Sequence, residues 1–107
     1  MKVIYIASPY TKGDVAENVR IQMDAAHRIM DAGHCPIAPN LSHFLHMHRA
    51  RPYEDWMKID FELINRADLV LRLDGASAGA DREVNHANRI GVKVIFGWDS
   101  LWLYLNR

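Results

Sequence analysis

The chain has 107 residues, half of them hydrophobic, which suits one small domain with one core. We therefore expect a single domain over residues 1–107. The 13 lysines and arginines balance the 13 aspartates and glutamates, and this zero net charge argues against a general binder of nucleic acid or another polyanion. The single cysteine, Cys35, excludes an internal disulfide and is typical of a reducing compartment.

The apolar run at the start of the chain predicts a strand. Val3–Ala7 is continuous and partly β-branched, which is typical of a central parallel strand buried on both faces. The whole run from Met1 is too short for a signal-peptide core or a membrane span. We therefore expect a cytoplasmic protein that has no membrane partner.

A loop, a long helix and a short extended piece are predicted next. Ser8–Gly13 is a loop by composition, and Asp14 is placed to cap the helix that ends at Gly33. Cys35–Ala38 is a short extended piece, and Asn40–Arg51 forms a short helix or an ordered loop. The apolar stripe of the long helix consists of Val15, Val19, Met23, Ala26 and Met30.

The middle of the chain predicts a helix, a strand and a second helix. Pro52 suits a helix start, and Leu69–Leu73 is the following strand. Ser77 or a neighbour caps a helix that runs to about Ile90 and closes at Gly91. The stripe of the helix after Pro52 consists of Tyr53, Trp56, Met57, Asp60, Leu63, Ile64 and Ala67.

The last predicted elements are a strand, Val92–Phe96, and a short helix capped by Asp99 or Ser100. Strands that alternate with helices indicate a parallel α/β sheet with right-handed crossovers. We therefore expect a three-layer α/β fold, flavodoxin-like or Rossmann-like, with a parallel sheet of four to five strands and helices on both faces.

Glu83 is the first candidate functional residue. The segment LDGASAGADREVNHA, residues 73–87, ends a strand, turns through small residues and sets Glu83 about one and a half turns into a helix. The ordinary interpretation is a solvated glutamate paired with a neighbouring arginine. The functional interpretation is a carboxylate in a ligand site, because small residues admit a ligand and helix N-termini at a sheet's carboxyl edge favour anions.

Asp60 is a carboxylate inside an otherwise apolar helical stripe. Such a position is costly unless the group is hydrogen-bonded or lines a cavity. It is either an aspartate at the edge of the core that bonds a loop amide, or a polar group directed into a pocket at the same sheet edge.

The loop after the first strand offers polar groups at that edge. It carries the hydroxyls of Ser8 and Thr11, the phenol of Tyr10 and the cation of Lys12, and it matches neither a Walker loop nor the dinucleotide glycine pattern. Tyr5, in the strand itself, is also compatible with plain core.

Three histidines, His43, His46 and His48, raise the question of a metal. His43 and His46 can share a helix face, but His48 points elsewhere and no acidic partner is fixed nearby. We therefore predict a histidine-lined pocket wall, with no metal and no cofactor.

The last helix is apolar on more than one side. Trp98 and Trp102 flank Leu101 and precede further leucines, a pattern that favours a subunit interface. We expect a homo-oligomer, a dimer or higher, formed through this helix.

In their order and spacing, these residues resemble the nucleoside 2-deoxyribosyltransferase-like family, which includes deoxynucleoside 5′-monophosphate N-glycosidases and similar bacterial and phage domains. The resemblance covers most of the chain. It rests on VIYIASPYT, on the Gly33-His34-x-Pro36 turn, on Asp60 eight residues before Asp68, and on SAGADREVNHA.

The resemblance implies a role for each candidate residue. Glu83 corresponds to the nucleophile of the family, Asp60 to an acid near the base and ribose that assists protonation of the leaving base, and Tyr5 to a tyrosine near the glutamate. The monophosphate glycosidases carry a serine at the position of Ser77, with a phosphate near it. This implies a nucleotide substrate bound by Ser8, Tyr10, Thr11, Lys12, Ser77 and Gly79.

The function expected from this resemblance is cleavage or transfer at the N-glycosidic bond of a (deoxy)nucleoside or its 5′-monophosphate, through a carboxylate nucleophile. The partner is then a small nucleoside or nucleotide. Two alternatives stay open: a non-catalytic nucleotide-binding or sensing module with the same pocket, and a structural subunit that assembles through its last helix.

Overall fold

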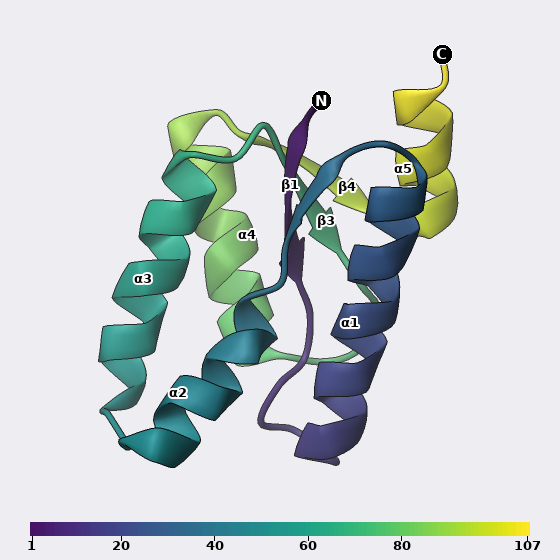
Figure 1. Ribbon diagram of the computed structural model, residues 1–107. Coiled ribbons are helices and arrows are strands. Elements are labelled where there is room, and N and C mark those ends of the chain that lie inside the picture. The colour runs from purple at the N-terminus through teal and green to yellow at the C-terminus, as the bar shows by residue number, and fades with distance from the viewer.

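A four-stranded parallel sheet lies between two layers of helices in the computed structural model, which describes all 107 residues (Figure 1). The strands follow the order β2-β1-β3-β4, and all three pairings are parallel. The predicted three-layer α/β fold is confirmed, with four strands. Their bounds are β1 (Val3–Ala7), β2 (Cys35–Ile37), β3 (Leu69–Arg72) and β4 (Lys93–Phe96).

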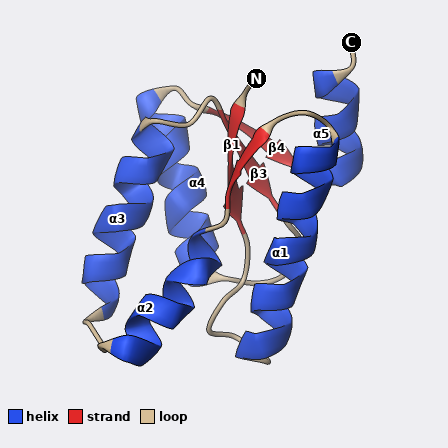
Figure 2. Ribbon diagram, viewed as in Figure 1, coloured by secondary structure: helices blue, strands red, loops and turns tan.

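Two pairs of helices cover the two faces of the sheet (Figure 2). Helices α1 (Val15–Asp31) and α5 (Trp98–Leu105) lie on one face, and α3 (Tyr53–Asn65) and α4 (Ala78–Ile90) on the other. A 3₁₀ turn, η1 (Pro39–Leu41), and the short helix α2 (Ser42–His48) connect β2 to α3.

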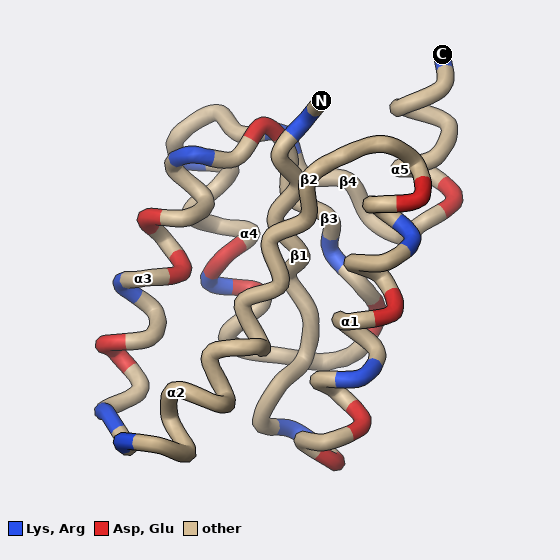
Figure 3. The backbone as a smooth tube through the Cα atoms, viewed as in Figure 1, with Lys and Arg blue, Asp and Glu red and all other residues tan.

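Alternate residues of the strands separate into two cores, one for each face. Ile4 and Ile6 pack with α1 and α5, whereas Tyr5 and Ala7 pack with α3 and α4. Acidic and basic residues alternate along α1, whereas α3 carries Glu54, Asp55, Asp60 and Glu62 beside a single cation, Lys58 (Figure 3). None of the helices has both the length and the apolar character that crossing a bilayer requires.

The buried face of α1 differs from the predicted stripe. Met23 and Met30 are 40% and 56% exposed, so this part of the prediction is wrong. Apolar residues occur on several sides of this helix, and periodicity alone therefore does not select the inner one. The buried residues are Val19, Gln22, Ala25 and Ile29.

Most of the predicted helix ends are confirmed. The Asp14 side chain accepts from the Glu17 amide, Ser77 from the Ala80 amide, and Gly91 ends α4 in the left-handed conformation. The predicted cap of α5 at Asp99 or Ser100 is wrong. The helix begins at Trp98, because Gly97 has a φ of +82° and turns the chain directly out of β4 into the helix.

The strand order places a topological switch point between β1 and β3. The chain leaves β1 for α1 on one face and leaves β3 for α4 on the other, so the loops after these strands diverge and open a crevice at the carboxyl edge. The two loops also pack together at their base. A Cβ built on Gly75, whose φ is +114°, would lie 2.8 Å from Pro9 Cγ, so only glycine permits this contact.

Gln22 holds three segments together beside the crevice. Its buried side chain donates from Nε2 to the Ile6 carbonyl (3.1 Å) and to Ser8 Oγ (2.8 Å). Its Oε1 accepts from the Asn40 amide at 2.7 Å. One side chain therefore joins β1, the loop after it and η1.

Replacing Gln22 by leucine should lower the free energy of unfolding by about 2 kcal/mol or more, because three buried polar groups lose their partner at about 1 kcal/mol each. Chemical denaturation measures the loss. The exposed neighbour Met23→Leu is the control, and an equal effect of the two substitutions would contradict the buried network.

Candidate active site

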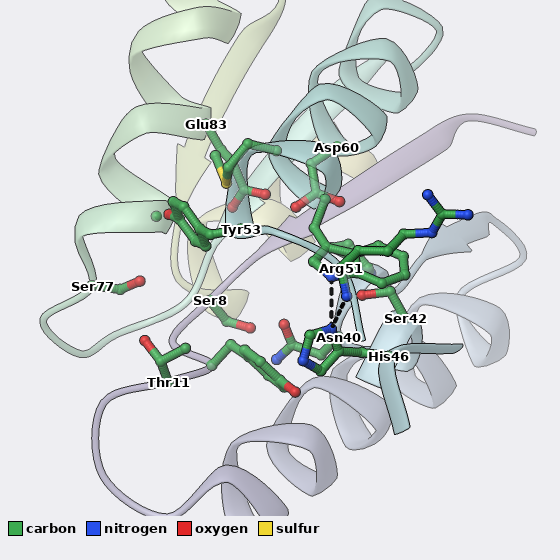
Figure 4. A pocket seen from close by; sticks show the side chains of 15 residues that line it. Ser8, Thr11, Asn40, Ser42, His46, Arg51, Tyr53, Asp60, Ser77 and Glu83 are labelled. Carbon is green, nitrogen blue, oxygen red and sulfur yellow. Dashed lines mark hydrogen bonds between the residues drawn. The ribbon is translucent and has the colours of Figure 1, made fainter. Parts of the chain in front are cut away.

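A cavity of about 250 Å³ opens at the carboxyl edge of β1 and β3 (Figure 4). Its volume is close to the lower end of the roughly 300–1,000 Å³ typical of small-molecule sites. It receives side chains from the loops after both strands and from η1, α2, α3 and α4. The lining residues are Ser8, Tyr10, Thr11, Pro39, Asn40, Ser42, His46, Arg51, Tyr53, Trp56, Met57, Asp60, Ser77, Gly79 and Glu83.

Glu83 is buried in the wall of this cavity. It is 5% exposed, and the hydroxyl of the fully buried Tyr5 donates a hydrogen bond to its Oε2. Glu83 is therefore not a solvated helix glutamate. The bond also gives the fully buried Tyr5 hydroxyl the partner that it needs away from water.

Asp60 faces Glu83 across the top of the cavity (Figure 4). It projects from α3, whereas Glu83 projects from α4, and both line the cavity. Of the two interpretations of Asp60, the structure agrees with a polar group directed into a pocket. Asp60 and Glu83 together are called the carboxyl pair below.

Burial raises the pKa values of both acids. The pKa of Glu83 rises to about 9, first through burial and then through the negative charge of Asp60. Burial also raises the pKa of Asp60, to about 6. At neutral pH the carboxyl pair therefore holds one proton between its two members, and its titration belongs to the pair rather than to either residue.

Two neighbours act on this ionisation in the opposite direction. The hydrogen bond from Tyr5 and the charge of Arg72 both lower the pKa of Glu83. The pKa of Tyr5 itself rises well above its usual value, through burial and then through the charges of Glu83 and Asp60. Tyr5 consequently keeps its proton and remains a donor to Glu83.

Arg72 is a buried cation at the end of β3. Its guanidinium donates to the carbonyls of Leu73 and Gly75, the latter at 2.8 Å, and lies 3.4 Å from Asp81 on the first turn of α4. It therefore fixes the turn that leads to Ser77.

A second wall of the cavity carries hydroxyl groups. Ser8 and Thr11 come from the loop after β1, and Ser77 from the N-terminus of α4 (Figure 4). Tyr53 closes this side by lying against Gly79, where a Cβ would come within 2.9 Å of the Tyr53 hydroxyl. Hydroxyl donors beside a helix N-terminus favour an anionic or hydroxylated ligand.

The structure brings together most of the residues predicted for the site. Tyr10 lines the cavity with the serines, threonine and glycine named above, and Tyr5 lies directly behind Glu83. Lys12 differs, because it is exposed on the same loop and does not line the cavity.

On one side of the cavity, sequence reasoning singled out only His46, as part of the predicted histidine-lined wall. The sequence could have placed Trp56 in the cavity wall, because it lies one helical turn before Asp60 on the same stripe. Asn40 and Ser42 follow β2 and had no pattern that separated them from ordinary loop residues. The further residue on this side is Arg51, whereas His43 and His48 of the predicted wall do not line the cavity.

Two of the three histidines of α2 bond to aromatic neighbours. His43 Nδ1 bonds the Tyr10 hydroxyl, and His46 Nδ1 accepts from the Trp56 indole. No three or more His, Cys, Asp or Glu side chains gather in a group that could hold a metal ion.

A family model described as "Domain of unknown function (DUF7768)" matches residues 2–97. No curated protein matches the chain. Among solved structures, the chain is similar to a 2-deoxyribosyltransferase from the psychrotolerant bacterium Bacillus psychrosaccharolyticus, with 23% sequence identity and a TM-score of 0.70. The similarity covers 88% of this chain and 70% of that one, and it shows that the two share a fold.

Replacing Glu83 by glutamine should stabilise the protein at alkaline pH. Because the folded-state pKa of Glu83 lies near 9 and its ordinary value is 4.5, the fold loses stability as pH rises between these values. The neutral amide removes this loss and still accepts from Tyr5. We expect a gain above about 1.4 kcal/mol at pH 8, the value of one pKa unit, and little difference at pH 4.

Thermal and chemical unfolding across pH 4–9 measure this difference. The exposed Glu62 on α3 provides the matched control Glu62→Gln, which should follow the wild type at every pH. A Glu83→Gln protein that is no more stable than the wild type at pH 8 would show that Glu83 is not buried as described.

Proposed function

We propose that this chain, which belongs to the DUF7768 family, cleaves or transfers the N-glycosidic bond of a (deoxy)nucleoside or its 5′-monophosphate. The observation that carries the proposal is the carboxyl pair, two buried acids from different helices that face one another in a cavity at the switch point of the sheet. The shared fold with a 2-deoxyribosyltransferase supports it.

Glu83 is the proposed nucleophile. Departure of the base leaves positive charge on C1′, and a carboxylate placed beneath that carbon stabilises the charge or forms a C1′–O bond. The Tyr5 hydroxyl holds Glu83 in one orientation and favours its ionised form. The electrons of the C1′–N bond leave with the base.

Asp60 is the proposed acid. In the resting pair the higher pKa of Glu83 keeps the single proton on that residue. In the reactive form the proton has moved to Asp60, which passes it to the departing base. Water, or a second base, then attacks C1′ and releases the Glu83 carboxylate, while a proton from the attacking group returns to Asp60. The two outcomes are hydrolysis and transfer.

The hydroxyl-lined wall is the proposed site for the sugar and its 5′ end. Ser8, Thr11 and Ser77 supply hydroxyl groups, and the N-terminus of α4 favours a phosphate. This wall suits either the 5′-hydroxyl of a nucleoside or the larger 5′-phosphate of a nucleotide.

Removing the nucleophile should abolish base release. We expect wild-type protein to release free base from at least one member of a panel of deoxynucleosides and their 5′-monophosphates, and Glu83→Gln to lose at least about 10³-fold in kcat. Liquid chromatography of the free base measures this. A second free base in the reaction separates transfer from hydrolysis.

Glu62→Gln is again the matched control and should retain full activity. Undiminished base release by Glu83→Gln would contradict the proposal. Saturable nucleotide binding without base release from any substrate would instead identify a sensing module.

The rate should depend on pH as a bell-shaped curve. Only the singly protonated carboxyl pair is active, so we expect kcat/KM to fall below about pH 6 as a second proton binds and above about pH 9 as the last one leaves. Asp60→Asn should lower kcat by about 10²–10⁴ and remove the alkaline limb, because the remaining Glu83 needs no proton. An alkaline limb that persists in Asp60→Asn would assign the acid to another group.

A further inference from the structure

The hydrogen bonds of His46 determine which of its two ring nitrogens carries the hydrogen. Its Nδ1 accepts from the Trp56 indole Nε1 at 2.9 Å and from the Arg51 amide at 3.3 Å. Both partners are N–H groups that can only donate. A neutral ring bonded in this way carries its hydrogen on Nε2, and this tautomer follows from the partners.

The other ring nitrogen is available to a ligand. His46 lines the cavity, and its Nε2 has no protein hydrogen-bond partner. The Trp56 ring meets the imidazole edge-on, with 5.7 Å between the ring centroids, and so holds its orientation. The Nε2–H group is therefore a positioned donor that cannot act as an acceptor.

The position of His46 in the cavity indicates which part of a substrate it contacts, an assignment that rests on the proposed function. Glu83 lies beneath C1′, and the hydroxyls of Ser77 and Thr11 occupy the side assigned to the sugar's 5′ end (Figure 4). His46 lies on the remaining side, bonded to Trp56, which is one helical turn from Asp60. That side is left for the base.

We propose that His46 makes the site selective for bases that present a carbonyl oxygen, namely 6-oxopurines and 4-oxopyrimidines, over their 6-amino and 4-amino counterparts. A carbonyl oxygen accepts from Nε2–H. An amino group in the same place brings two donors together and leaves both without a partner, at a cost of about 1–3 kcal/mol.

Among the neighbouring groups on this side, Ser42 is neutral to this preference and Asn40 offers one acceptor. The Ser42 hydroxyl can donate or accept, so it suits either kind of base. The Asn40 amide nitrogen already donates to the Pro9 carbonyl at 3.2 Å and to the Asn18 carbonyl at 3.5 Å, so only its carbonyl oxygen remains to accept from an amino group.

The test compares kcat/KM for deoxyinosine against deoxyadenosine and for deoxyuridine against deoxycytidine, as nucleosides and as 5′-monophosphates. We expect the wild type to favour the oxo member of each pair by about tenfold or more. His46→Gln, whose amide can donate or accept, and Trp56→Phe, which leaves His46 Nδ1 only the 3.3 Å bond, should reduce the preference to about threefold or less.

His48→Gln, an exposed position outside this cavity on the same helix, should retain the wild-type ratio. A wild type without the preference, or an unchanged ratio in both His46→Gln and Trp56→Phe, would overturn the proposal.

Two further measurements separate this proposal from the proposed function. The ¹⁵N NMR signals of His46 should show the Nε2–H tautomer in the free protein, and the Nδ1–H tautomer would overturn the proposal whether or not base is released. If no substrate releases its base, calorimetry measures the binding of the same nucleosides. Tighter binding of the oxo members that weakens in His46→Gln supports the role of His46, although the catalytic proposal fails. Equal binding of oxo and amino members overturns the catalytic proposal and the proposal for His46.

Discussion

The site depends on the burial of Glu83 against Tyr5. A carboxyl group inside a protein is costly unless it is neutralised or hydrogen-bonded, and here the tyrosine on the central strand and the proton shared with Asp60 meet that need. The bond joins β1 to α4 across the face of the sheet. The interaction that orients the acid therefore also links the strand to the helix that carries it.

The remaining parts of the site follow from where the chain diverges. Because α1 and α4 leave neighbouring strands toward opposite faces, space opens above β1 and β3. Gln22 and the contact between Pro9 and Gly75 fix the loops on either side of that space. The cavity is thus bounded by segments with buried anchors, which keeps its hydroxyl groups in place before any ligand arrives.

Much of the fold was predictable, because helices, strands and helix caps follow from short stretches of sequence. The alternation of strands and helices, the caps at Asp14 and Ser77, and Gly91 at the end of α4 depend on neighbouring residues only. Asp60 stood out because a charge within an apolar stripe is unusual. Oligomerisation through the last helix stays a prediction. The exposure of Leu103 on that helix, 71%, is compatible with it.

Other features depend on contacts between distant segments and leave no local pattern. The inward position of Gln22 on α1 is favourable only because Asn40 and Ser8 come to meet it. The state of His46 requires Trp56, ten residues later in the chain and on another helix. Such residues resemble ordinary polar positions until the fold brings their partners together.

Arg72 gives the site one more property. Its guanidinium fixes the turn before Ser77 and also acts on the charge of Glu83, so substrate positioning and acid strength rest on one side chain. A substitution there alters both traits in a single step. Evolution of the pocket toward a new ligand through this turn is therefore constrained, since the position of Ser77 and the acid strength of Glu83 change together at Arg72.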